Sequence, residues 1–165
     1  MTIPDSFKGK TSINQKPSAA LKKLHIAYEK KVSSAPNFAS FTPYDLEVYI
    51  ENLLQNDSNF LNIKRVAGSK EHGADITCIR ILDNALIVIQ VKHYWKSTLS
   101  IEAIKQILWA KQSYSAQIGI IATTSSKIPQ DVYTEARKLN IPILALSDLL
   151  IWSEGKSPSV LFFKI

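Results

Sequence analysis

The order of segments in this sequence predicts an α/β domain in which a mixed sheet of about five strands lies between helices on both faces. Two strand-like runs on either side of Asp83 and Asn84 have no helix between them, so the first three strands are expected to be antiparallel. The later strand-like runs alternate with helical runs, which predicts parallel strands. With only five glycines the chain has no glycine-rich phosphate loop, and a doubly wound nucleotide-binding fold is disfavoured.

The composition is that of one soluble domain of 165 residues, 45% of them hydrophobic. No apolar run approaches the roughly 20 residues that span a bilayer, and the polar start is no signal peptide, so a cytoplasmic protein without a membrane partner is expected. The one cysteine, Cys78, is expected to be a small buried hydrophobic residue. One cysteine and three histidines give no zinc-ligand spacing, so any bound metal should be a hard ion with oxygen ligands.

Residues 1–40 are predicted to form a basic arm and helix. They hold seven lysines and two acidic residues, so their net charge is +5 within the total of +6. Such an arm is a candidate phosphate-binding surface, with Lys22 and Lys23 as nucleic-acid-binding residues. Apolar residues at helical spacing in the same segment equally predict a helix that docks on the core while its lysines stay solvated, and the two interpretations are compatible.

The next helix is predicted to begin after Thr42, which can cap it, with Asp45 in the first turn. Glu47 lies at the edge of its apolar stripe, where a carboxylate can be half-buried and still reach a site; the alternative is a surface glutamate. Asn56–Asn59 should end this helix, and the first strand is expected at Ile63–Ala67. The stripe that should face the core consists of Leu46, Tyr49, Ile50, Leu53 and Leu54.

The hairpin that follows brings polar groups together at one strand end. If Asp83 and Asn84 are a two-residue turn, Thr77 faces Gln90 and Asp75 faces Lys92. Because side chains alternate along a strand, Gln90, Lys92 and Asp75 then point to the same side. The simplest interpretation is an ion pair between Asp75 and Lys92. The strand before Gln90 is apolar at every position, however, so polar groups at its end call for partners.

Gly73-Ala74-Asp75 followed by Gln90-Val91-Lys92 resembles the active-site signature of the Mrr-type branch of the PD-(D/E)XK nuclease superfamily, in which Gln replaces the middle acidic residue. The resemblance runs from about Thr42 to Trp152 and includes the order of elements. It departs at Ala74, where the superfamily name has Pro, and the chain is expected to have no room for a separate DNA-binding domain. The resemblance implies a restriction-endonuclease-like sandwich and an endonuclease that hydrolyses DNA with Mg²⁺ or Mn²⁺.

The resemblance also implies roles for individual residues. Asp75 and the backbone carbonyl of Val91 would bind the metal, and Glu47 would reach it directly or through water. Lys92 would polarise the attacking water or steady the charge on the phosphate, and Gln90 would offer a neutral oxygen. Two alternatives remain beside the DNA endonuclease: a catalytically silent nucleic-acid-binding or regulatory protein on the same fold, and an RNA nuclease.

Residues just past the two central strands are further candidates for binding nucleic acid. Tyr94 and Lys96 can stack on bases or hold phosphates, although aromatics at a strand end are more often core or interface. A parallel crossover would bring Thr123 and Thr124 to the same edge of the sheet, where they bind phosphate oxygens or simply cap and turn the chain. The flanking histidines, His72 among them, are expected to be exposed.

The remaining segments complete the expected fold. Gln106, on the helix after the hairpin, lies away from that helix's apolar stripe and is expected to be solvated. The apolar tail should either pack on the domain or contact a second copy in a homodimer. The chain is divided into an arm (1–40), a nuclease-like domain (41–153) and a tail (154–165). The expected elements are helices at Ser100–Tyr114, Pro129–Leu139 and Ser147–Trp152, and parallel strands at Ile118–Ala122 and Ile141–Leu146.

Overall fold

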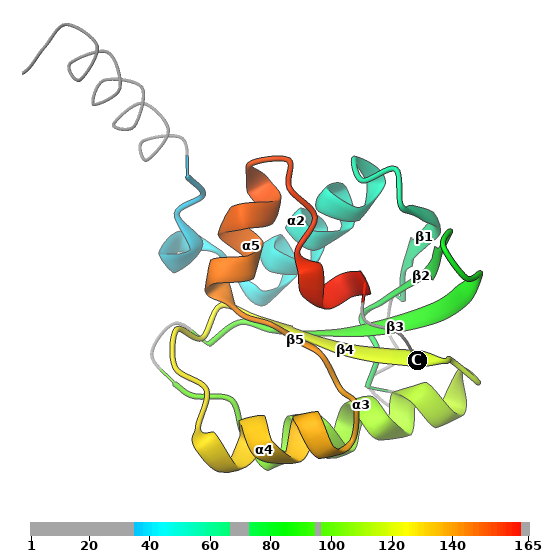
Figure 1. The fold of residues 1–165 in the computed structure, drawn as a ribbon. Helices are drawn as coiled ribbons and strands as arrows, with labels where there is room; N and C mark the ends of the chain where they lie inside the picture. Colours follow the sequence, from blue (N-terminus) through cyan, green and yellow to red (C-terminus); the bar gives the residue numbers. More distant parts are fainter. Residues whose placement is uncertain (1–34, 67–72, 95–96, 163–165) are drawn as a thin grey trace, which may run out of the picture. The chain divides into compact units, whose positions relative to one another are not determined.

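A five-stranded mixed sheet, with the strands in the spatial order β1-β2-β3-β4-β5, lies at the centre of the computed structural model (Figure 1). The structure describes residues 35–66, 73–94 and 97–162. The first three strands are antiparallel and the last two continue in parallel, which confirms the predicted mixed sheet. The strands are β1 (Phe60–Arg65), β2 (Ile76–Arg80), β3 (Ala85–Lys92), β4 (Ile118–Thr123) and β5 (Ile143–Leu144).

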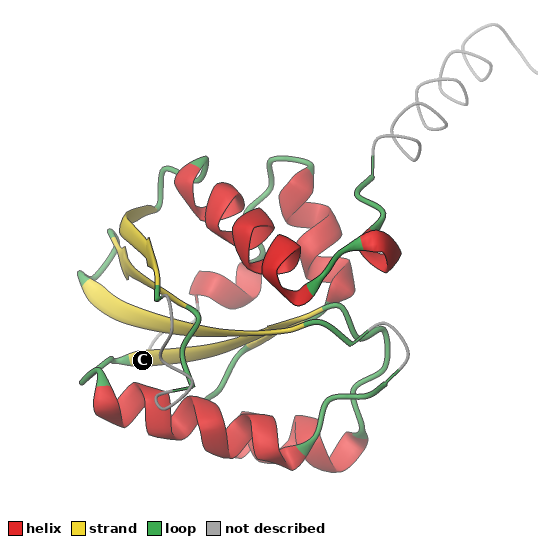
Figure 2. Ribbon diagram, turned by 180° about the vertical axis from the view of Figure 1, so that it is seen from behind, coloured by secondary structure: helices red, strands yellow, loops and turns green. Residues whose placement is uncertain are grey.

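Helices cover both faces of the sheet, as predicted: α2 and α5 lie on one face, and α3 and α4 on the other (Figures 1 and 2). Each face has its own apolar core, with Ile89 in the α2 and α5 core and Val88 in the α3 and α4 core. No helix in the described ranges is long and apolar enough to cross a membrane. The helices are α2 (Pro43–Gln55), α3 (Ile101–Ser113), α4 (Gln130–Lys138) and α5 (Leu146–Ser153), with short 3₁₀ turns at Phe38–Ser40 (η1) and Ser159–Phe162 (η2).

Helix α2 begins at the cap that the sequence predicts. The Thr42 hydroxyl accepts a hydrogen bond from the Asp45 N–H at 3.1 Å, and the Asp45 carboxylate accepts one from the Thr42 N–H at 2.8 Å. This capping box satisfies two N–H groups that the first turn would otherwise leave unpaired. Leu46, Ile50 and Leu54 are fully buried, so the predicted apolar stripe is confirmed.

Strand β1 begins at Phe60, three residues before the predicted start. Phe60 is buried beside Trp152, with ring centroids 6.2 Å apart. This packing is consistent with a strand that begins earlier in the sequence than predicted. The pairing with β2 shifts by one residue between Leu61 and Lys64, where Asn62 has φ +53°. Asn tolerates that left-handed conformation, so Asn62 is accommodated at a bulge within the strand.

The hairpin turn is longer than the two residues that the sequence predicts. Arg80 pairs with Ala85 and Thr77 with Val88, so the predicted pairing of Thr77 with Gln90 is wrong by two residues. The cause is Arg80, which is buried and donates to the Asp83 carboxylate from Nε at 2.9 Å and from Nη2 at 2.5 Å. A shift of two residues keeps every side chain on its face, so the predicted grouping at the strand end survives.

Cys78 and the C-terminal segment behave as buried hydrophobic groups. Cys78 is fully buried, and this burial raises the pKa of its thiol to about 12. Leu161 is also fully buried, and Val160 and Phe162 pack against the same core. Of the two expected roles for the tail, the described part therefore packs on the domain.

Two elements near the end of the chain differ in length from the sequence prediction. β5 contains two residues, whereas six had been expected, because the chain pairs with β4 only around Ile143 and Leu144. Helix α5 in turn begins at Leu146, where Asp148 accepts a hydrogen bond from the Ala145 N–H at 2.9 Å. Ala145 and Leu146, which were predicted to belong to the strand, therefore form the N-cap and the first residue of α5.

Candidate active site

Asp75, Gln90 and Lys92 meet at the end of the sheet where β1 ends, β2 begins and β3 ends. Asp75 directly precedes β2, and Gln90 and Lys92 close β3. The last two alternate with Ile89 and Val91, which face the α2 core, so Gln90 and Lys92 point to the side of α3. Glu47 approaches from α2, on the other face. These residues therefore lie at the ends of two internal strands, between the two helical layers.

Asp75 is tied to both neighbouring strands. Its N–H donates to the Ile89 carbonyl at 2.8 Å, and its own carbonyl accepts from the Val66 N–H at 2.8 Å. Its carboxylate accepts a hydrogen bond from the Val91 N–H at 2.6 Å. Burial raises the pKa of the Asp75 carboxyl, although the Val91 N–H and the charge of Lys92 both lower it. The negative form of Asp75 is therefore short of compensating positive charge.

The expected ion pair between Asp75 and Lys92 is not formed. No salt bridge joins these two side chains in the described part of the chain, although the charge of Lys92 acts on Asp75 at longer range. Lys92 is half-buried. Its ammonium group is thus held near the carboxylate without neutralising it by direct contact.

Glu47 is half-buried on the edge of α2, as the helical pattern predicts. Burial raises the pKa of Glu47, the negative charge of Asp75 raises it further, and Arg65 opposes both effects. Arg65 itself turns away to other partners: its Nε lies 2.7 Å from Glu51, and its guanidinium stacks over the Tyr44 ring at 4.8 Å. The two carboxylates are close enough to interact electrostatically, and each would be stabilised in its charged form by a nearby positive charge.

Gln90 is almost completely buried, with 3% of its surface exposed. Its Nε2 donates to the side-chain oxygen of Gln106 at 2.9 Å. Its own Oε1 is buried and has no hydrogen-bond partner among the described residues. A buried acceptor without a partner is rare in proteins, so this oxygen calls for a partner that the described residues do not supply.

The prediction that Gln106 is solvated is wrong, because Gln106 is half-buried and bonded to Gln90. The prediction considered only the large apolar residues of α3 and left out two alanines. Ala103 and Ala110 are both buried, and Gln106 lies three residues after one and four before the other. Counting alanines as core-facing would have widened the stripe to include Gln106.

Thr123, the last residue of β4, and Thr124, which follows it, already form hydrogen bonds. Thr123 and Thr124 have 0% and 1% of their surfaces exposed. The Thr124 hydroxyl accepts from the Tyr94 N–H at 2.9 Å, and the Thr123 hydroxyl accepts from the Ser125 N–H at 3.1 Å. These bonds describe the turn-building role that the sequence also allowed, and leave little surface for a phosphate.

Tyr94 is half-buried and packs against the α3 and α4 core. The neighbouring His93 is also half-buried, with Nε2 3.0 Å from the Phe38 carbonyl, so this ring is engaged with η1. The other predicted residues, Lys22, Lys23, Lys96 and His72, lie outside the described residues.

The donors that could hold a metal ion are mixed in type. Across residues 35–66, 73–94 and 97–162, no three His, Cys, Asp or Glu side chains gather to hold an ion by themselves. Asp75 and Glu47 supply two carboxylates, and the unpartnered oxygen of Gln90 supplies an amide. All three are the hard oxygen ligands that Mg²⁺ and Mn²⁺ accept.

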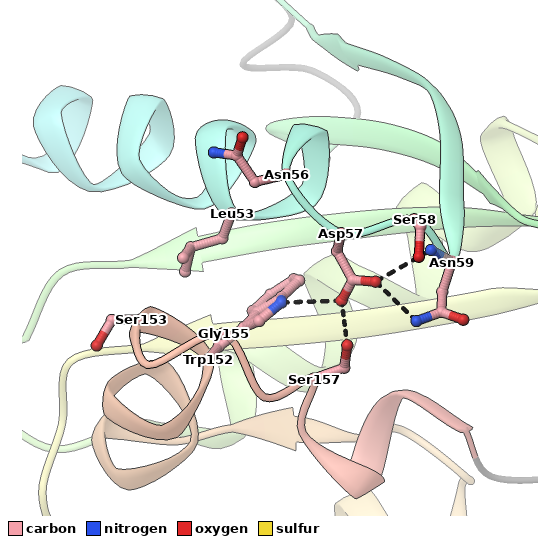
Figure 3. Close-up of a pocket in the computed structure, with 9 residues that line it drawn as sticks. All are labelled: Leu53, Asn56, Asp57, Ser58, Asn59, Trp152, Ser153, Gly155 and Ser157. Carbon is pink, nitrogen blue, oxygen red and sulfur yellow. Dashed lines mark hydrogen bonds between the residues drawn. The ribbon is translucent and has the colours of Figure 1, made fainter.

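A hollow of about 420 Å³ lies at the C-terminal end of α2, beside Asp57 (Figure 3). Asp57 Oδ1 accepts from the backbone and side chain of Asn59 at 3.0 and 2.7 Å, and Oδ2 accepts from Trp152 Nε1 at 3.0 Å and from the Ser157 hydroxyl. Four donors saturate this carboxylate. Its role is to fasten the end of α2 to α5 and to the segment that follows.

In comparisons with known proteins, residues 38–152 match the family model Mrr_cat, which is described as restriction endonuclease. No curated protein sequence matches the chain. Among solved structures, the chain is similar to the MspJI restriction endonuclease in complex with a 27-mer oligonucleotide, at 13% identity and a TM-score of 0.49. It is also similar to the DNA modification-dependent restriction endonuclease AspBHI, at 14% identity and a TM-score of 0.46.

A third similar structure is the ATP-dependent type ISP restriction-modification enzyme LlaBIII bound to DNA, at 20% identity and a TM-score of 0.45. The likenesses cover 91%, 96% and 67% of this chain, in the same order. They cover only 35%, 42% and 8% of the larger chains. This chain therefore spans less than half the length of each of these proteins.

Proposed function

This chain belongs to the Mrr_cat family of restriction endonucleases, and from that membership we propose that it is a metal-dependent endonuclease that hydrolyses phosphodiester bonds in DNA. The observation that carries the proposal is the half-buried carboxylate of Asp75, whose pKa burial raises despite the Val91 N–H and the charge of Lys92, near Glu47. The buried oxygen of Gln90, without a partner among the described residues, adds to it. Asp75 and Glu47 are close enough for their charges to interact, and a divalent cation would neutralise both carboxylates.

The residues fit a magnesium or manganese ion. Asp75 and Glu47 would bind it through carboxylate oxygens, and Gln90 through its amide oxygen. The N–H and C=O groups of a strand residue point to the same side, and the Val91 N–H points to Asp75, so the Val91 carbonyl is directed to that side as well. When bound, the ion would polarise the phosphate and make a coordinated water a stronger nucleophile at neutral pH.

Lys92 completes the chemistry that the chain itself supplies. Its ammonium group acts on Asp75 through charge and forms no salt bridge among the described residues, so its N–H donors would be available to a phosphate oxygen or to the attacking water. In that position it would stabilise the negative charge that develops on the phosphate. Glu47, whose pKa is raised, would accept a proton from water or hold the cation through water.

Contact with nucleic acid would extend beyond these residues. Tyr94 is half-buried, so only part of its ring is available for stacking. Lys92 lies in the site itself, and Lys96 follows Tyr94 in the sequence. The basic arm with Lys22 and Lys23 would add sequence-independent attraction to the phosphate backbone.

A cleavage assay tests the proposal. Supercoiled plasmid, single-stranded DNA and RNA are each incubated with the purified chain and Mg²⁺ or Mn²⁺, and with excess chelator as control. Nicking or linearisation of plasmid that requires the ion and disappears in Asp75→Asn supports a DNA endonuclease. Cleavage of RNA alone would move the substrate class to RNA. Binding of DNA without cleavage under any condition would support the silent nucleic-acid-binding alternative.

A further inference from the structure

The Gln90 amide has one end bound and one end free. Its Nε2 is fixed by the Gln106 oxygen at 2.9 Å, while its Oε1 is buried without a partner among the described residues. The two ends of an amide are nearly equal in size but opposite in character, since the oxygen accepts hydrogen bonds and the nitrogen donates them. The partner on one end therefore decides which chemical group the other end presents.

From this arrangement we propose that Gln106 is a positioning residue, which fixes the Gln90 amide so that its oxygen, and not its NH₂ group, faces the bound cation. The inference rests on the proposed function, because it assumes that the site takes a divalent ion. It assigns a task to a helix residue that would not itself touch the ion.

The backbone of Gln106 packs closely against Gly73, which belongs to the Gly73-Ala74-Asp75 motif. Gly73, two residues before Asp75, has φ +66°, and a Cβ atom at this position would lie 2.7 Å from the Gln106 carbonyl oxygen. The backbone of α3 thus touches the glycine directly. The buried neighbours Ile104 and Ile107 anchor the same turn of α3 in the core. The Gln106 side chain therefore starts from a fixed backbone position.

Without the Gln106 oxygen, nothing described would select one orientation of the Gln90 amide. The terminal torsion of a glutamine is broad and roughly two-fold, so the amide can turn its NH₂ group outward at little cost. An NH₂ group offers no lone pair to a cation and would point partial positive charge at it. Loss of the Gln106 acceptor should therefore weaken ion binding, even though every direct ligand is still present.

The experiment is a titration of the full chain with Mn²⁺ by calorimetry, without DNA. Gln106→Met keeps the size of the side chain but removes the acceptor, and ion affinity is expected to fall about 10-fold or more, as for other residues that orient metal ligands. Gln106→Glu retains the acceptor and should bind at least as tightly as wild type. Gln112→Glu, at an exposed position on the same helix, controls for the added charge.

The background Gln90→Glu separates orientation from general damage to the site. Both ends of that side chain are oxygens, so orientation no longer matters, and adding Gln106→Met should leave ion affinity unchanged. The inference is overturned if Gln106→Met binds Mn²⁺ as wild type does, or if it weakens binding equally in both backgrounds. A wild-type chain that binds no Mn²⁺ would overturn the proposed metal dependence together with this inference.

Discussion

The carboxylate of Asp75 accepts the backbone N–H of Val91 at 2.6 Å, so the acidic residue of the site is fastened across the hairpin to the strand that carries Gln90 and Lys92. The bond fixes the carboxylate relative to both side chains. It uses one oxygen of Asp75 and leaves the other without a hydrogen bond among the described residues. The Val91 N–H therefore positions the Asp75 carboxylate, and its second oxygen could accept a ligand.

Asp75→Asn should separate these two roles. The new side chain can still accept the Val91 N–H but no longer carries charge, so the fold should persist while cleavage falls on the order of 100-fold or more. Cleavage rate and thermal midpoint are measured together. Asp75→Ala is the comparison, since it removes the hydrogen bond as well and should be the less stable variant. Unchanged cleavage in Asp75→Asn would remove Asp75 from the site.

Lys92→Met should lower cleavage on the order of 100-fold without weakening Mn²⁺ binding, because the ammonium group acts on the phosphate or the water and is no ligand. Its loss also leaves Asp75 with less compensating charge, so ion affinity should rise slightly. The matched control is Lys105→Met, an exposed lysine in a surface pair with Glu102 at 3.6 Å, which should change neither rate nor stability. Wild-type cleavage by Lys92→Met would contradict the role.

Gln90→Glu should raise Mn²⁺ affinity and retain some cleavage, because it adds a negative charge at the unpartnered oxygen. At an effective dielectric near 20, a unit charge about 4 Å from a doubly charged ion gains roughly 8 kcal/mol before desolvation offsets most of it. Without the ion, the variant should be less stable than wild type, since the carboxylate replaces the N–H that Gln106 accepts. Equal or weaker ion affinity would exclude a metal-facing Gln90.

The pH dependence of stability should reflect carboxyl groups whose pKa values are shifted in opposite directions. Hydrogen bonds from Ser157, Asn59 and Trp152 outweigh the effect of burial and lower the pKa of Asp57, so its contribution is present above the ordinary carboxyl pKa, about 3.9, and is lost as pH falls through the lowered value. The raised pKa values of Asp75 and Glu47 have the reverse effect in the metal-free chain, which should lose stability as pH rises through them.

Urea unfolding at several pH values measures both effects. Trp152→Phe removes one donor to Asp57 and should cost about 1.5 to 3 kcal/mol near neutral pH, with a smaller cost in acid where Asp57 is protonated. Asp75→Asn should flatten the loss at rising pH. A cost of Trp152→Phe that does not change with pH would assign it to packing alone.

Deletion of residues 1–17, which carry Lys8, Lys10 and Lys16, should weaken DNA binding and flatten its salt dependence if the arm contacts phosphates. Each lost contact on duplex DNA lowers the slope of log affinity against log salt by roughly 0.9. A variant with the same three lysines changed to glutamine keeps the length of the arm and should match the deletion. An unchanged slope in both would leave the arm as a solvated segment.

The sequence predicted the shared face of Gln90 and Lys92 better than the turn of the hairpin that carries them. The register of the hairpin differs by two residues because Arg80 is buried and bonded to Asp83, and no local pattern announces that ion pair. Since side chains alternate with period two, an error of two leaves Gln90 and Lys92 on the predicted side. An error of one would have put them on the opposite face.

The role of Gln106 was out of reach for a different reason. Helical periodicity predicts which face of a helix packs on the core. It cannot identify a polar pair that forms between a helix and a strand. The bond between Gln90 and Gln106 depends on how close α3 lies to the sheet, which Gly73 permits. Such a contact becomes visible only once both elements are placed.

The buried guanidinium of Arg80 also bears on the order in which the chain can fold during synthesis. Its Nη1 donates to the Leu161 carbonyl at 2.8 Å, across 81 residues of sequence. Asp57 likewise takes donors from Trp152 and Ser157. A nascent chain that has grown only through β4 would keep the Arg80–Asp83 and Asp57–Asn59 contacts. It would lack the later partners, and each missing hydrogen bond to these charged groups would cost about 1.5–3 kcal/mol. The domain should therefore reach its full stability only after the segment through Leu161 has left the ribosome.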